Sequence, residues 1–151
     1  IYFALEDSFY NNLTEWDNSS ELNSNEDYGF FENGVCKIYN AGDVSMPFSV
    51  WVKMHSNDQI LKRLEVACNG KAIVLNNVEP PKQKQKKGYY LVIDTDSNTV
   101  EVFTGDGKQT GITYNHCLAP ESEFFSLPLG EQLLTVIGAE PIKINFHYLY
   151  Y

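Results

Sequence analysis

The sequence predicts an all-β protein whose antiparallel strands form two packed sheets, as in a β-sandwich or jelly roll. Apolar and polar residues alternate with a period of two over much of the chain, whereas an apolar stripe at helical spacing is hard to find. At least seven such segments are separated by turns rich in glycine, asparagine and proline. Short strands divided by such turns are typical of sandwiches that bury the inner faces of both sheets.

The N-terminal part of the chain is acidic and poor in strand signals. Residues 1–36 hold eight of the 20 Asp and Glu residues and none of the 11 Lys and Arg residues, so the net charge of −9 divides into −8 here and −1 in the remainder. Residues 11–27 are rich in Asn, Ser, Glu and Asp, which predicts a long surface loop or a partly ordered arm. We therefore expect one sandwich domain over residues 1–151, with an acidic, loop-rich segment at 1–36.

The first strands follow the turn at Asn33-Gly34. Val35 to Tyr39 form one expected strand, and Phe48 to Met54 form the next. In the second of these, alternation places Phe48, Val50, Val52 and Met54 toward the core and Ser49, Trp51 and Lys53 on the opposite face. Trp51 is thus expected off the core, and residues 55–63 are expected to form a turn of helix.

Two hairpins and two further strands complete the expected sandwich. Leu64–Cys68 and Lys71–Leu75 flank Asn69-Gly70, a pair that favours type I′ turns because both residues accept positive φ. Tyr89–Asp94 and Thr99–Phe103 flank a second turn at 95–98. The last strands are Leu133–Ile137 and 142–151, and alternation in the latter predicts a core face made of Ile142, Ile144, Phe146, Tyr148 and Tyr150.

Charge and hydropathy exclude several classes of function. A charge of −9 repels phosphate, so we expect no nucleic-acid partner. No apolar run approaches the roughly 18–20 residues that span a bilayer, and residues 1–10 lack the pattern of a signal peptide, so we expect a soluble protein without membrane insertion. Cys36, Cys68 and Cys117 are too scattered for a disulfide framework or a zinc motif, and we expect them to be reduced and buried.

One loop is basic. Four lysines lie within residues 82–87, after Pro80-Pro81 and before Gly88. Such a charged run is typical of a solvated connection. The alternative is electrostatic pairing with residues 1–36 of an adjacent subunit.

The sequence contains no recognised catalytic motif, so we expect no enzymatic activity and no cofactor. It lacks the Gly-x-Ser-x-Gly, His-Glu-x-x-His, P-loop and dinucleotide patterns, and His116 and Cys117 are adjacent residues that point apart on an extended chain. Asp94-Thr95-Asp96 resembles the start of a calcium loop, but Thr99 and Gly105 occupy the positions where an EF-hand needs Gly and Glu. A polar hairpin turn is the favoured interpretation. Asp7, Asp94 and Asp96 are left as calcium candidates without a supporting motif.

Aromatic residues outside the expected core are the remaining candidates for binding, because sugars stack on exposed rings. Those expected in loops, on the off-core face or at the terminus are Trp16, Trp51, Tyr89, Tyr114, Tyr150 and Tyr151. Three interpretations stay open for them: ordinary packing, a sugar-binding platform, and a subunit interface, where Tyr and Trp are enriched.

Three segments, in a fixed order, resemble the C-terminal domain of the distal tail (Dit) proteins of long-tailed bacteriophages. Ile38 to Phe48 is similar to the family pattern N-x-G-D-x-x-x-P-F. Leu91 to Thr95 is similar to a strand and turn of the pattern l-x-I-D-t. Phe125 to Glu131 is similar to the segment f-x-L-p-x-G-x-N before a final strand ending in Tyr, except that Glu131-Gln132 replaces the Asn. The similarity covers about residues 38–151.

The resemblance implies a galectin-like or carbohydrate-binding-module-like sandwich that follows an N-terminal belt domain, with the belt domains forming a hexameric ring at the tail tip. It implies a structural role in the virion, with other tail or baseplate proteins and copies of the same chain as partners. Because the chain starts at Ile1 without a belt domain, we expect it to be the C-terminal part of a longer protein.

A second resemblance keeps an alternative open. Leu5 to Phe9, followed by Leu13 and Trp16, is similar to the first strand of jelly-roll carbohydrate-binding modules. The alternative function is therefore recognition of cell-surface glycans through exposed aromatic rings. A glycan-active enzyme, the least favoured reading, would need two carboxylates that face each other across a groove.

Overall fold

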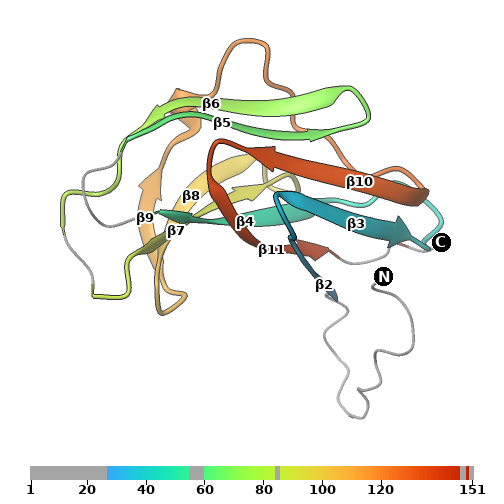
Figure 1. The fold of residues 1–151 in the computed structure, drawn as a ribbon, viewed down its shortest axis with the longest axis horizontal. Coiled ribbons are helices and arrows are strands. Elements are labelled where there is room, and N and C mark those ends of the chain that lie inside the picture. Colours follow the sequence, from blue (N-terminus) through green and yellow to red (C-terminus); the bar gives the residue numbers. More distant parts are fainter. Residues whose placement is uncertain (1–26, 55–59, 84–85, 147–148, 150–151) are drawn as a thin grey trace.

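The protein is an antiparallel β-sandwich of two sheets (Figure 1), described by a computed structural model over residues 27–54, 60–83, 86–146 and 149. One sheet has four strands in the order β3-β10-β5-β6, and the other has six in the order β2-β11-β4-β7-β8-β9. The predicted all-β sandwich is confirmed. Its assignment to the jelly-roll type stays a prediction.

The four-stranded sheet contains β3 (Val35–Asn40), β5 (Leu61–Cys68), β6 (Lys71–Val78) and β10 (Gly130–Ile137). The six-stranded sheet contains β2 (Asp27–Phe30), β4 (Phe48–Met54), β7 (Tyr89–Asp94), β8 (Thr99–Thr104), β9 (Gln109–Thr113) and β11 (Glu140–Phe146). A single 3-10 turn, η1 (Asn115–Cys117), follows β9. Within the described residues, no helix has the length and apolar character needed to cross a bilayer.

The core lies between the two sheets and follows the alternation of the strands. In β4, the side chains of Phe48, Val50, Val52 and Met54 are buried, whereas Lys53 is exposed and Trp51 lies on the outer face. Each such buried apolar side chain stabilises the fold by about 1.5–3 kcal/mol relative to its exposed state. The predicted inner and outer faces of this strand are confirmed.

Two-residue turns set the register of neighbouring strands. Asn69 and Gly70, between β5 and β6, have φ angles of 55° and 76°, as a type I′ turn requires at both central positions. Asn33 and Gly34 show the same signature, with φ angles of 55° and 79°, before β3. The predicted hairpins β5–β6 and β7–β8 are both confirmed.

Two parts of the strand prediction are wrong. Residues 61–63, expected in a turn of helix over 55–63, belong to β5, and residues 55–59 lie outside the described residues. Strand β2 lies in the segment 1–36 that was expected to be loop-rich, and strand β9 covers residues to which no element was assigned. Both are short edge strands of the six-stranded sheet, and β9 is mostly exposed, so it carries no alternating apolar signal.

The last strand is shorter and less regular than expected. In β11, Ile144 and Phe146 are buried as predicted, but Ile142 is only half-buried. The cause is a shift of register between Pro141 and Lys143, where Ile142 falls in a bulge against β4. Tyr148 and Tyr150 lie outside the described residues.

The three cysteines are free thiols. Cys36 and Cys68 are buried as predicted, and burial raises the pKa of the Cys36 thiol to about 12, which keeps it protonated at neutral pH. Cys117 is only half-buried, because it ends the η1 turn at the surface, so its predicted burial is wrong.

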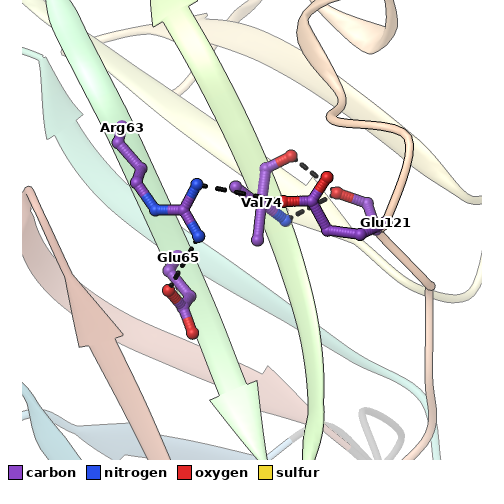
Figure 2. Close-up of polar contacts among 5 residues, drawn as sticks. Arg63, Glu65, Val74 and Glu121 are labelled. Carbon is purple, nitrogen blue, oxygen red and sulfur yellow. Dashed lines mark hydrogen bonds and ion pairs between the residues drawn. The ribbon is translucent and has the colours of Figure 1, made fainter.

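The outer edge of β6 is covered by residues 118–123. The Ala119 N–H donates to the carbonyl oxygen of Val74 (2.8 Å), and the Val74 N–H donates to Ser122 Oγ (2.7 Å). Arg63 of β5 reaches across to Glu121 of the same segment at 3.9 Å and to Glu65 at 3.4 Å (Figure 2). Such a covered edge cannot take up another strand.

Candidate functional site

The segments that carry the phage-tail resemblance meet in the folded chain. Asn40 ends β3 and is only 2% exposed. Its Nδ2 donates to the carbonyl oxygens of Val44 (3.1 Å) and Leu127 (3.0 Å), and its Oδ1 accepts from the Gly42 N–H (2.9 Å). Met46 and Leu127 also exchange two backbone hydrogen bonds. The first and third segments are therefore held together directly.

Thr95 attaches the second segment to the first. Its backbone N–H donates to the carbonyl oxygen of Phe48 (2.9 Å), and its Oγ1 accepts from the Phe48 N–H (2.9 Å). The ring of Phe48 contacts that of Phe125, with centroids 5.3 Å apart. All three segments thus form one contiguous unit, which we call the motif unit, and its buried polar groups are engaged in holding the chain.

An apolar stripe runs along the outer face of the four-stranded sheet. Seven large apolar side chains of the described residues are exposed, and four of them lie on or beside β3 and β10: Tyr39 (41%), Leu129 (52%), Leu133 (53%) and Ile137 (61%). Polar residues alternate with these side chains: Thr135 lies between Leu133 and Ile137 on β10, and Lys37, opposite Leu133, forms an ion pair with Glu131 (3.1 Å) within the stripe. Several large exposed apolar side chains on one sheet face favour a protein contact there.

An aromatic cluster occupies the outer face of the six-stranded sheet. The ring of Trp51 lies 4.9 Å from that of Phe103 and 5.8 Å from that of Tyr90, and Lys143 Nζ lies 4.8 Å above the Trp51 ring. Val92, opposite Trp51 on β7, is only 5% exposed although it points outward. Trp51 therefore lies off the core as predicted, but its ring is already packed on several sides.

A small hollow adjoins this cluster. It has a volume of about 80 Å³, and Ser49, Asp94, Asp96 and Asn145 contribute to its lining. This volume is far below the few hundred Å³ that small-molecule pockets usually have. Two buried atoms on this face, Trp51 Nε1 and Asn145 Oδ1, have no hydrogen-bond partner among the described residues.

The calcium candidates take part in a turn. Asp94 Oδ1 accepts from the Asp96 N–H at 2.9 Å, as in an Asx turn. Within the described ranges, no three His, Cys, Asp or Glu residues are grouped as a metal site requires. Calcium binding by Asp94 and Asp96 stays a prediction, and Asp7 lies outside the described residues.

Two of the predicted aromatic platforms are buried instead. Tyr89 is 4% exposed and Tyr114 is 8% exposed. Their hydroxyls donate to the carbonyl oxygens of Gln83 and Glu79, on either side of Pro80-Pro81, and burial raises the pKa of Tyr114. The prediction that these rings are accessible is wrong, because the loop after β6 folds back over them. Trp16, Tyr150 and Tyr151 lie outside the described residues.

A groove that sequence reasoning missed lies where the chain passes from one sheet to the other. It has a volume of about 560 Å³, and we call it the basic groove. It is lined by Lys53, Ile60, Leu61, Lys62, Arg63, Gly138, Ala139 and Glu140. These residues come from the end of β4, the start of β5 and the link between β10 and β11, so no local pattern connects them.

The apolar stripe was missed for a different reason. Leu133-Leu134 and Val136-Ile137 place apolar residues on both faces of β10. This breaks strict alternation and is the one signal in the sequence that could have revealed the stripe.

Comparisons of the chain with protein-family models, with curated proteins and with solved structures find no match. The function is therefore argued from the fold and from these surfaces.

Proposed function

We propose that this chain is a non-enzymatic structural domain of a bacteriophage or prophage tail tip or baseplate, with a role in assembly or host attachment. The observation that carries the proposal is the motif unit. Asn40, Thr95 and Leu127 bind the three segments directly to one another, so the residues that carry the resemblance form a single part of the fold. The antiparallel sandwich agrees with the fold that the resemblance implies.

The apolar stripe supplies a contact face for this role. Leu133 and Ile137 are each more than half exposed on the outer face of β10, which favours burial against a protein partner. The partners in this proposal are other tail or baseplate proteins and copies of the same chain in a homo-oligomeric ring, and the location is the virion.

The proposal is tested by locating the chain in particles. Antibodies raised against the domain should label the tail tip of phage particles, or of particles induced from a prophage, in immunogold electron microscopy. Serum pre-adsorbed with the pure domain is the control. Particles without label at the tail would contradict the proposal.

A variant tests the contact face in the same particles. The double variant Leu133→Asp, Ile137→Asp should be incorporated into particles at least about tenfold less than the wild-type protein. The reason is that burying a carboxylate without a partner is costly. Ile112→Asp is the matched control, since Ile112 is an exposed apolar residue (39%) on the other sheet. Equal incorporation of all three proteins would exclude the stripe as the contact face.

We keep glycan recognition as a second proposal, because the aromatic cluster lies beside a polar hollow on an open sheet face. The rings of Tyr90 and Phe103 are half-buried beside Trp51, and Ser49, Asp94 and Asn145 lie on the same face beyond Trp51. Sugars bind where an aromatic face adjoins a few hydrogen-bonding groups.

A glycan array separates the two proposals. Under the glycan proposal the protein binds a defined set of sugars, and Tyr90→Ala weakens this binding at least about tenfold, because stacking contributes a large share of such affinity. Tyr39→Ala, an exposed tyrosine on the opposite sheet, leaves it unchanged. Absence of binding across the array would remove the second proposal and leave the first intact.

A further inference from the structure

The connection from β6 to β7 carries lysines and is attached to the sandwich. Its described residues are 79–83 and 86–88. The hydroxyls of the buried residues Tyr89 and Tyr114 donate to the carbonyl oxygens of Gln83 and Glu79. A buried tyrosine hydroxyl needs such a partner, so each contact fixes one point of the backbone. The first part of the connection is therefore held in place at two points, unlike a freely solvated loop.

The second part packs against the turn between β8 and β9. The Gly105 N–H donates to the carbonyl oxygen of Gly88 (2.8 Å), and Lys87 Nζ lies 3.1 Å from Asp106 Oδ1. A Cβ atom at Gly105 would clash with the backbone of Lys87, so only glycine lets the two backbones approach this closely. The two segments form one unit, which we call the lysine unit and define as residues 79–83, 86–88 and 104–108.

The lysine unit is positively charged, although the chain as a whole carries −9. Its charged residues are four exposed lysines and two acids: Lys82, Lys86, Lys87, Lys108, Glu79 and Asp106. They give a net charge of +2. Among the described residues, Lys82, Lys86 and Lys108 form no ion pair. Charges more than about 10 Å away are largely screened at about 0.1 M salt, so the local charge favours an anionic ligand.

Two aromatic residues on the outer face of the six-stranded sheet lie next to the lysine unit. Tyr90 and Phe103 are directly opposite each other on β7 and β8. Tyr90 follows Lys87 by three residues, and Phe103 is opposite Gln109, the residue after Lys108. Each aromatic residue thus has a lysine Cα atom within about 10 Å of its own. A ligand that spans both features meets half-buried rings and ammonium groups together.

A polymer of acidic sugars combines the two properties that this surface selects. Its sugar rings can stack on aromatic side chains, and its repeated carboxylates can face the lysines. A nucleic acid has stacking bases as well, but it carries one charge per about 1.7 Å and binds through many phosphate contacts. A net local charge of +2 in an acidic chain suits the more sparsely charged polymer.

We propose that the lysine unit, together with the neighbouring rings of Tyr90 and Phe103, binds an acidic polysaccharide. The proposal rests on glycan recognition, the second function proposed above, and adds the class of sugar and the residues that recognise its charge. Lysine binds an anion as a point charge without a fixed geometry. The lysines therefore select for charge, and the rings select for sugar.

Binding of the full chain to polygalacturonate, a polymer of acidic sugars, tests the proposal by surface plasmon resonance. The fully methyl-esterified polymer is the matched neutral ligand and should bind at least about tenfold more weakly, because it offers the lysines no charge. The double variant Lys86→Glu, Lys108→Glu should bind polygalacturonate at least about tenfold more weakly than the wild-type protein. Raising the salt from about 0.05 to about 0.5 M should weaken binding as well, because salt screens exposed charges.

A second double variant controls for overall charge. Lys37→Glu with Lys71→Glu makes the same change of charge on exposed lysines of the other sheet and should leave binding unchanged. Tyr90→Ala should weaken binding of the acidic polymer, because the ring contributes the stacking contact. Circular dichroism establishes that all three variants fold.

Several outcomes would overturn the proposal. Equal binding of the acidic and neutral polymers, or equal losses in the two lysine variants, would overturn it and leave glycan recognition standing. Equally tight binding of single-stranded DNA would show a general polyanion site. Binding that appears only after the acids of residues 1–26 are changed to amides would assign the lysines to that segment. Absence of binding to polygalacturonate would also overturn the proposal, whereas the glycan array and immunogold labelling decide the two proposed functions separately.

Discussion

Gly138→Ala is expected to destabilise the protein by about 4 kcal/mol or more, a loss found only for severe backbone or core defects. Gly138 lies in the two-residue link that carries the chain from β10 to β11 and has a φ of 95°. A Cβ atom at this position would lie 1.9 Å from the carbonyl oxygen of Arg63. The obstacle is backbone of β5, which cannot rotate away as a side chain could, so the link or the strand must shift.

A second glycine separates this clash from simple conformational strain. Gly107 has a similar φ of 87°, but a Cβ atom there would meet no atom of the described residues within 4 Å. Gly107→Ala should therefore cost only about 1–2 kcal/mol, the usual penalty for a left-handed alanine. Urea unfolding followed by circular dichroism measures both losses. Similar losses for the two variants would show that the contact with Arg63 is unimportant.

Asn40→Ala is expected to destabilise the protein by about 2–4 kcal/mol, because it removes three hydrogen bonds at a buried site. The side chain ties Gly42 and Val44 of its own turn to Leu127 of a distant segment. Without it, the carbonyl oxygen of Val44 and the Gly42 N–H lose their partner. The motif unit should loosen first, which amide hydrogen exchange at residues 42–46 would detect.

Two further variants identify which part of the amide matters. Asn40→Asp keeps the acceptor for Gly42 but cannot donate to Val44 and Leu127, so it should be at least as destabilising as alanine. Asn76→Ala is the matched control, because Asn76 is half-buried on β6 and its side chain makes no hydrogen bond to any described residue. A loss at Asn76 as large as at Asn40 would contradict a special role for the motif unit.

Asn40 and Gly42 also connect the stability of the protein with the proposed function. Asn40 and Gly42 belong to the first segment that resembles the phage-tail family. The Gly42 N–H donates to Asn40 Oδ1, and Asn40 Nδ2 donates to the carbonyl oxygen of Leu127 in the third segment. Asn40 thus holds the end of β3 to the segment that precedes β10. The apolar stripe overlaps the motif unit at Tyr39 and Leu129, whereas Trp51 of the aromatic cluster and the basic groove lie outside it.

Much of the fold follows from local pattern. Alternation in Phe48–Met54 separates its two faces correctly, and Asn69-Gly70 identifies a hairpin because both residues accept positive φ. The placement of Trp51 off the core follows from the same alternation. These features depend on residues within a few positions of each other, so the amino-acid sequence alone is enough to predict them.

The exposure of single side chains and the shape of the surfaces depend on distant segments. The sequence pattern predicts that Tyr89 and Tyr114 are accessible, yet the loop after β6 covers both side chains. Lys53, Lys62 and Glu140 form one groove only because β4, β5 and the β10–β11 link meet at one end of the sandwich. Local alternation determines that a strand has two faces, whereas long-range packing decides what covers each face and which charges become neighbours.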